Sequence, residues 1–222
     1  MDKQRLTSAI KIQLGDTRPS TRSAVHESKH SLQENFELLN AFDEVLLKPG
    51  GMIKHRISQT GILFLLPVVG ACEIKYAETR TVDVGEIYFN HVEGNKTLQI
   101  RNPYGHAFIR FVIWELRGEA NESMALNGFD LTLDIGNLIR IFKGSVNGQR
   151  IAVRAGMFEG RGEGSLSLPN ASQFIFVLEG AFEVQNRLLH AHDALSIPAC
   201  THLEFEALSS HAIFVGSKPV LS

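Results

Sequence analysis

Short apolar runs separated by turn residues recur along most of this chain. Residues 62–66 are apolar throughout, which is typical of a strand that is buried on both faces. Residues 73–76 instead alternate polar and apolar side chains, as in a strand with one face in water. Further β-rich runs cover residues 86–89, 97–100 and 107–114, and Gly, Asn or Pro stands between most of them. Strands this short and this closely spaced predict an antiparallel sandwich or barrel, and they argue against parallel strands joined by helices.

The same pattern divides the chain into two β-rich halves. Residues 1–35 are polar, and we expect them to form an arm that can contribute strands. Regular structure is predicted from Phe36, and the polar and charged stretch from Glu115 to Asn127 is the best candidate for a linker. We therefore predict an all-β protein with two tandem antiparallel barrels, at residues 36–118 and 129–222, joined by a linker at residues 119–128.

The two halves repeat one another. Residues 70–74, Gly-Ala-Cys-Glu-Ile, correspond to residues 180–184, Gly-Ala-Phe-Glu-Val, at an offset of 110 residues. Further along, residues 85–87 correspond to residues 192–194 at an offset of 107. Offsets shared by several features favour a duplicated domain with a shorter hairpin in the second copy. His190 and His192 have the spacing of a metal-binding pair, but the repeat places them in a turn before Asp193.

Composition and charge narrow the range of partners. The 222 residues are 44% hydrophobic and carry a formal net charge of −2, with a pI near 6.5. We therefore expect no direct binding to nucleic acid and no membrane association, because no basic field attracts phosphates. The polar start has no signal-peptide core and the apolar stretch 61–72 is too short to span a bilayer, so a cytoplasmic location is expected. Cys72 and Cys200 lack a CxxC spacing and are predicted to be small apolar core thiols.

Several motifs resemble those of cupins, and among them the pirin-related proteins with two barrels. A glycine turn followed by a turn of the Gly-Asp type is the cupin rhythm, present at residues 70 and 85–86 and again at residues 180 and 192–193. The leucine-rich entry, Pro-Gly-Gly turn and His-Arg pair of pirins correspond to residues 46–56, and their Asn-Pro dipeptide corresponds to Asn102-Pro103. Strands similar to those of pirins lie at residues 111–114, 174–180 and 212–216. The resemblance covers most of the chain from about residue 36 and implies two cupin-type jelly-roll barrels.

The resemblance to pirins also implies a metal site on the inner wall of the first barrel. Pirin-like proteins hold iron or a similar metal there with three histidines and a glutamate, and a His-x-His pair supplies two of these ligands. Its two positions correspond here to Ile53 and His55, which share one face of a strand because side chains alternate with a period of two. The other two ligands precede the Asn-Pro dipeptide and correspond to Leu98 and Ile100. Only one of the four positions therefore carries a side chain that can bind a metal.

These four residues define the predicted pocket of the first barrel. One imidazole cannot hold a divalent ion against water and cellular competitors, so we expect no metal and no other cofactor. Aliphatic side chains at the other three positions should leave an apolar pocket or a filled core. A displaced site for iron or another divalent metal would have to combine His55 with His91, Glu93 or His106, which are near it in sequence.

Three hypotheses about function follow. The first is a non-enzymatic pirin-like bicupin, a binding or regulatory module without catalytic residues, which accepts a small apolar ligand in the first barrel or acts through protein contacts. The second is a metal-dependent dioxygenase with the displaced ligand set, since the resemblance implies the quercetin-oxidising activity associated with pirin relatives. The third is a cofactor-free isomerase or epimerase, for which only His55 is a suitable acid–base residue. Because open barrels have edge strands, pairing into a homodimer is a further hypothesis.

Overall fold

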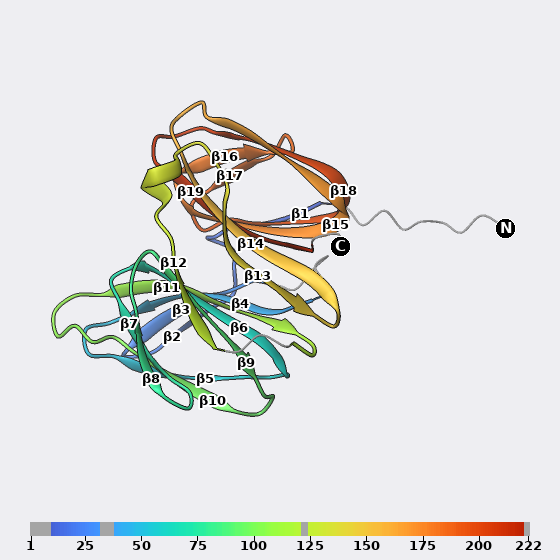
Figure 1. The fold of residues 1–222 in the computed structure, drawn as a ribbon. Helices are drawn as coiled ribbons and strands as arrows, with labels where there is room; N and C mark the ends of the chain where they lie inside the picture. Colours follow the sequence, from blue (N-terminus) through green and yellow to red (C-terminus); the bar gives the residue numbers. More distant parts are fainter. Residues whose placement is uncertain (1–9, 32–37, 121–123, 220–222) are drawn as a thin grey trace.

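The computed structural model describes residues 10–31, 38–120 and 124–219, and within them antiparallel strands form two lobes (Figure 1). The only helical element of these residues is a short 3-10 helix, η1 (Leu131–Asp134), which lies between β12 and β13 in the sequence. The predicted all-β antiparallel architecture is confirmed, although strand pairing does not close either barrel within the described residues. No helix in this part of the chain is long and apolar enough to cross a membrane.

The first lobe contains two antiparallel sheets that face each other. The larger sheet has, in spatial order, the strands β12 (Ala125–Gly128), β9 (Glu86–Val92), β6 (Gly61–Val69), β11 (Ile109–Arg117), β4 (Leu39–Leu47), β3 (His26–His30) and β2 (Ser20–Arg22). The smaller sheet has β5 (Met52–Arg56), β10 (Thr97–Arg101), β7 (Cys72–Lys75) and β8 (Thr79–Val82). Buried side chains from both sheets, among them Leu63, Ile74 and Leu98, form the core between them.

The second lobe is one strongly bent sheet. Its strands in spatial order are β13 (Ile139–Val146), β14 (Gln149–Phe158), β19 (Ala212–Pro219), β15 (Glu163–Glu179), β18 (Ala194–Ala207), β16 (Ala181–Val184) and β17 (Leu188–His190). The long strands β15 and β18 curve around a core of their own, to which Phe158, Phe182 and Phe205 contribute edge-to-face ring contacts.

A second layer of apolar side chains joins the two lobes. Along β6, Leu63 and Leu65 point into the first lobe, whereas Ile62, Phe64 and Leu66 point toward the second. This confirms that the run 62–66 is buried on both faces. The ring of Phe64 stacks on Trp114, with centroids 4.9 Å apart, and meets Phe142 of the second lobe edge-to-face at 4.8 Å. Because aromatic side chains bury large apolar areas, this layer holds the two lobes in a fixed relation.

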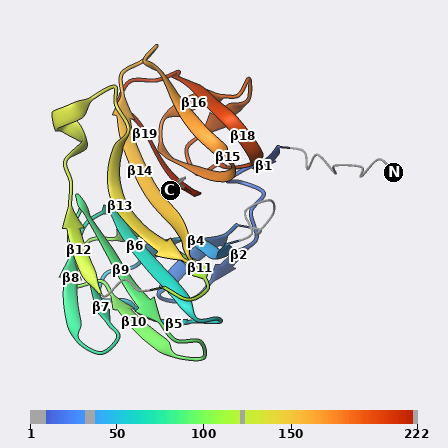
Figure 2. The same cartoon turned by 45° about the vertical axis from the view of Figure 1, so that its right-hand side comes forward.

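The polar arm contributes strands to both lobes. The short strand β1 (Lys11–Gln13) pairs with β18 of the second lobe, whereas β2 and β3 extend the larger sheet of the first. Figures 1 and 2 show β1 beside β18, away from the rest of the amino-terminal strands. In the segment of the arm between β1 and β2, the backbone N–H of Gly15 donates a hydrogen bond to Oδ1 of Asp193 at 2.6 Å. The arm therefore crosses the junction between the lobes.

The structure corrects the predicted linker. Residues 125–128 form β12, which pairs with the edge strand β9, and Leu126 packs against the core of the first lobe. The charged residues that precede this segment dominated the sequence interpretation and concealed the short apolar run that adds a strand. Glu115, where the polar stretch begins, lies within β11 and is only 3% exposed. Residues 121–123 lie outside the described residues, as do the predicted first residues of regular structure, Phe36 and Glu37.

The internal repeat appears in the structure as equivalent turns. Gly70 and Gly180 both have positive φ angles, of 69° and 76°, at the ends of β6 and β15. Gly85 and His192 occupy equivalent left-handed positions in the later turn, with φ angles of 88° and 75°. A histidine is uncommon in this backbone region, so the second lobe holds the imidazole of His192 at a position where the first lobe has glycine.

Candidate functional site

The register between β5 and β10 brings the four residues of the predicted pocket together. Ile53 pairs with Ile100, and His55 pairs with Leu98, so the four side chains form two neighbouring cross-strand pairs. Directly paired residues of an antiparallel ladder point to the same face. Because Leu98 and Ile100 belong to the core between the two sheets, all four side chains lie on the inner wall of the first lobe.

The three aliphatic members of this set pack into the core. Leu98 is 1% exposed and Ile100 is fully buried, and Ile53 is partly buried against the same cluster. Ile100 also pairs with Ile74 on β7, so its second neighbour is aliphatic as well. These side chains occupy the inner wall with groups that have no lone pair to offer a metal.

His55 has a carboxylate partner that the sequence interpretation missed. Its Nε2 atom lies 2.7 Å from Oε1 of Glu115 on β11, and Nδ2 of Asn40 on β4 donates a hydrogen bond to the other carboxylate oxygen at 2.9 Å. The side chain of Glu115 is 4% exposed and that of His55 is 13% exposed. Both oxygens of this buried carboxylate are engaged, which offsets the cost of removing it from water.

Local strand geometry aims these groups inward. Along β11, Phe111, Ile113 and Glu115 alternate with side chains that face the second lobe, so Glu115 points into the first lobe. Next to it the register shifts, because Glu115 pairs with Ala41 and Leu116 with Leu39, which leaves Asn40 as the extra residue of a β-bulge. The period of two from Phe111 onward was therefore a signal in the sequence that could have identified Glu115 as an inward-facing residue.

The residues considered for a displaced metal site do not gather around His55. His91 pairs with Ile62, whose side chain faces the second lobe, so His91 points away from the inner wall. Glu93 is exposed and forms an ion pair with Lys96 at 3.6 Å, and His106 is exposed in the turn between β10 and β11. Within the described ranges, no group of three or more His, Cys, Asp or Glu side chains is arranged to hold a metal ion.

The residues on the inner wall therefore do not fit the metal that the resemblance to pirins implies. Three of the four corresponding positions carry aliphatic side chains, and the imidazole of His55 is bound by Glu115. A stable site for a transition metal needs several inward nitrogen, oxygen or sulfur ligands with an open position for substrate. The arrangement can instead exchange a proton at His55 or bind an apolar group beside Ile53.

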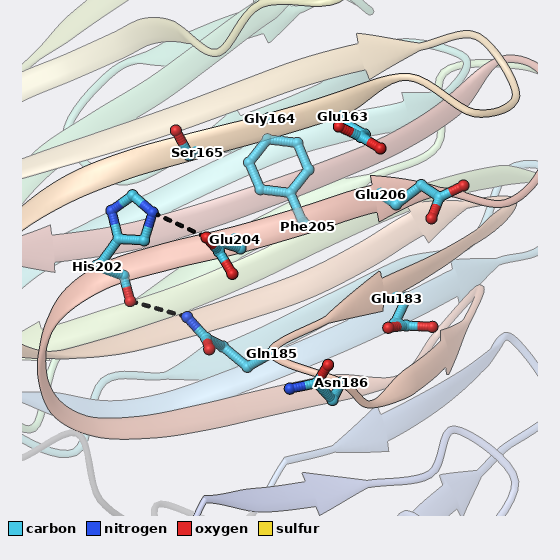
Figure 3. A pocket seen from close by; sticks show the side chains of 10 residues that line it. All are labelled: Glu163, Gly164, Ser165, Glu183, Gln185, Asn186, His202, Glu204, Phe205 and Glu206. Carbon is cyan, nitrogen blue, oxygen red and sulfur yellow. Dashed lines mark hydrogen bonds and ion pairs between the residues drawn. The ribbon is translucent and has the colours of Figure 1, made fainter.

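A pocket of about 660 Å³ lies on the second lobe, lined by residues of β15, β16 and β18 and the turn after β16 (Figure 3). Glu206 pairs with both Glu163 and Glu183, and Glu204 lies two residues away on the same strand. Neighbouring like charges destabilise a sheet, and here Arg161 contacts Glu206 at 2.9 Å and His202 contacts Glu204 at 3.2 Å. The result is an acidic, water-exposed surface that the separate glutamates did not reveal in the sequence.

A polar cluster also joins the two lobes. The carboxylate of Glu44 on β4 lies 2.6 Å from Nδ1 of His192 and 3.6 Å from the buried guanidinium of Arg18. Burial raises the pKa of Glu44, but the hydrogen bond from His192 and the positive charges of His192, Arg18 and Arg110 outweigh it, so that pKa lies below its ordinary value. Arg18 also donates hydrogen bonds to the carbonyls of His192 and Lys29, and so ties the arm to both lobes.

Neither a known family model nor a curated protein sequence matches this chain. Solved structures do share its fold. Pirin YhhW from Escherichia coli has a TM-score of 0.78 at 12% identity, over 96% of this chain and 100% of that chain, and it is also solved in complex with nickel(II). GK1651 from Geobacillus kaustophilus has a TM-score of 0.69 at 14% identity over 94% of each chain. Oxalate decarboxylase from Lactobacillus farciminis has a TM-score of 0.64 at 10% identity, over 95% of this chain and 87% of that chain.

These likenesses extend over both lobes, and identities of this size establish the fold and nothing finer. The predicted cupin fold agrees with them. The chain is therefore a protein of the cupin fold.

Proposed function

We propose that this chain is a pirin-like bicupin that works without a metal in its first lobe, as a binding or regulatory module. The observation that carries the proposal is the inner wall itself. Ile53, Leu98 and Ile100 fill three of the positions that correspond to metal ligands, and the remaining imidazole of His55 is bound to Glu115. One imidazole that already has a carboxylate partner binds a divalent ion too weakly to compete with water and other cellular ligands.

Restoring the ligands tests this proposal. The triple variant Ile53→His, Leu98→His and Ile100→Glu adds two histidines and a glutamate beside His55, on two adjacent strands. We expect it to bind about one Ni²⁺ per chain in isothermal titration calorimetry, as four inward ligands should, whereas the wild-type chain binds none in the first lobe. The matched control Ile53→Asn, Leu98→Asn and Ile100→Gln introduces similar polarity without strong ligands, and should not bind Ni²⁺.

Elemental analysis of the purified wild-type protein tests the alternative, that the first lobe does bind a metal. Stoichiometric iron, nickel, zinc or manganese that is lost in His55→Ala would overturn the proposal and favour the metal-dependent dioxygenase. That alternative needs ligands other than His91, Glu93 and His106, because these side chains do not converge on His55. Circular dichroism of each variant would separate a loss of binding from a loss of fold.

A specific observation favours a second candidate function, cofactor-free acid–base catalysis. An ionised Glu115 accepts a hydrogen bond from Nε2 of His55, which leaves Nδ1 able to take up a proton. Buried carboxylates orient catalytic histidines in this manner in unrelated enzymes. The test is deuterium incorporation into a panel of keto acids and keto sugars in D₂O, followed by NMR. Exchange that disappears in His55→Gln and Glu115→Gln supports this candidate, and the absence of exchange across the panel eliminates it.

The proposed module has two kinds of partner, a small apolar ligand and a second copy of the chain. A small apolar ligand in the first lobe would lie beside Ile53, since Leu98 and Ile100 are buried, and Ile53→Trp should block it. Pairing into a homodimer would use an edge strand such as β5 or β8 of the smaller sheet. Light scattering of the wild-type chain measures the oligomeric state directly.

A further inference from the structure

A pocket of about 270 Å³ lies where the two lobes meet, away from the inner wall of the first lobe. Strands β3, β4 and β11 of the larger sheet form its base, and the turn before β18 of the second lobe covers one side. Its lining consists of Glu27, Lys29, Glu44, Leu46, Arg110 and His192. This volume is slightly below the roughly 300–1,000 Å³ of most ligand pockets, so it suits only a small molecule.

The strand register arranges these side chains in two rows. In the first row, Leu46 stands between Glu27 on β3 and Arg110 on β11. In the second row, two residues along β4, Glu44 stands opposite Lys29. Leu46 is 39% exposed and forms an apolar floor between the two cationic side chains. Since Lys29 and Arg110 approach this floor from opposite strands, one bound group could contact both.

The two carboxylates of the lining, Glu27 and Glu44, already have cationic partners. Glu44 is neutralised by Arg18 and His192, and Glu27 forms an ion pair with Arg22 at 3.0 Å. Arg110 pairs with Glu179 at 2.9 Å, but that carboxylate is half exposed, so water and ligands can compete for it. Lys29 makes no ion pair with any carboxylate in the described part of the chain. With both lining carboxylates paired to other cations, Lys29 and Arg110 are the positive charges of the lining that a bound anion can reach.

Arg110 also has an unmet hydrogen bond. Its Nε atom is buried and has no acceptor, although most buried donors in folded proteins have one. Oε2 of Glu44 is likewise buried without a hydrogen-bond donor, and it faces the guanidinium of Arg18 at 3.6 Å. Glu44 pairs with Arg18 and His192 and lies 4.0 Å from the guanidinium of Arg110. Lys29 and the Nε atom of Arg110 nevertheless retain capacity for an anion.

We propose that this pocket binds a small organic anion, with a carboxylate held by Lys29 and Arg110 and an apolar body over Leu46. Two charge-assisted contacts on opposite sides of a carboxylate give both affinity and orientation. Because His192 belongs to the second lobe, a ligand that reaches it bridges the two lobes. This pocket shares no lining residue with the inner wall around His55. A failure to bind an organic anion would therefore not bear on the proposed absence of a metal.

Benzoate is a suitable probe, since it combines a carboxylate with a compact apolar ring. We expect saturable binding of benzoate in isothermal titration calorimetry and a higher melting temperature at saturation, because a ligand that binds only the folded state stabilises it. Benzylamine has the same ring with the opposite charge and should not bind. Equal binding of benzylamine and benzoate, or no saturable binding of benzoate to the wild-type chain, would overturn the proposal.

Variants locate the binding site. Lys29→Gln and Arg110→Gln should each weaken benzoate binding by about tenfold or more, the loss expected for one charge-assisted contact. Leu46→Glu adds a carboxylate to the floor and should abolish binding without removing either cation. The matched control Lys143→Gln removes an exposed lysine of β13 that does not line the pocket, and should bind as the wild type does. Unchanged affinity in Lys29→Gln, Arg110→Gln and Leu46→Glu would assign the ligand to another site and refute this one.

Discussion

Nε2 of His55 lies 2.7 Å from Oε1 of Glu115, and the two residues are 60 positions apart in the sequence. The contact joins the smaller sheet of the first lobe to the larger one, across an interior of mainly apolar side chains. The side-chain amide of Asn40 donates a hydrogen bond to the second carboxylate oxygen of Glu115, so both oxygens have a partner. The first lobe thus contains a self-contained polar pair at the place where the resemblance to pirins implies a metal.

Removing the Glu115 carboxylate should destabilise the protein. In Glu115→Leu, the imidazole of His55 and the amide of Asn40 lose their shared acceptor, and each buried donor left without a partner costs about 1–3 kcal/mol. Glu115→Gln keeps a hydrogen-bonding side chain and should cost about 1–2 kcal/mol. Urea unfolding measures both free energies, with exposed Glu93→Gln as the control. Equal stabilities of the Leu and Gln variants would contradict this account of the pair.

Acid should weaken the contact between the two lobes through Glu44. Its pKa is lowered in the folded state, so the stability that it contributes is present above its ordinary pKa of about 4.5 and is lost as the pH falls through the lower folded value. The free energy of unfolding should therefore decrease more steeply below pH 4.5 in the wild type than in Glu44→Gln. Urea titrations at a series of pH values would show this difference, and identical slopes for the two proteins would refute it.

The aromatic layer between the lobes should contribute strongly to stability. Phe64→Ala removes a ring that contacts Trp114 and Phe142, and truncation of a buried phenylalanine costs about 3–5 kcal/mol. Since Trp114 is the single tryptophan of the chain, its emission reports both the unfolding transition and the altered packing. Val69→Ala, at an exposed position on the same strand, should change the free energy of unfolding little. If Phe64→Ala also changed the free energy of unfolding little, the neighbouring side chains would be filling the space left by the ring, and the prediction would be wrong.

The two cysteines should react slowly with thiol reagents in the folded protein. Burial raises the pKa of Cys72 to about 12, and burial also raises that of Cys200, so the reactive thiolate is scarce at neutral pH. In Cys200→Ser, the remaining Cys72 should not react with Ellman's reagent at pH 8 until urea is added. Rapid reaction of the folded variant would show that Cys72 becomes accessible through local opening. Both thiols are free in the structure, as expected from their spacing.

Much of the fold could be predicted because it depends on patterns between consecutive residues. The uniform apolar run at residues 62–66 predicted a strand buried on both faces, and β6 lies between two clusters of core residues. The repeated glycines predicted equivalent turns, and Gly70 and Gly180 both have the left-handed conformation. The short strand β12 was missed because the charged residues before it outweighed a brief apolar run.

The sites depended on contacts that no local pattern contains. Alternation along β5 could orient His55 inward, but it could not select Glu115 as its partner, because that pairing requires two sheets to face each other in one register. Glu44 and His192 are 148 positions apart and meet only where the lobes dock. By itself, the sequence determined most of the strands, the repeated glycine turns and the aliphatic side chains on the inner wall. Only the tertiary structure decided which charged groups pair, because partners are chosen by distance in space and by the loss of water that docking imposes.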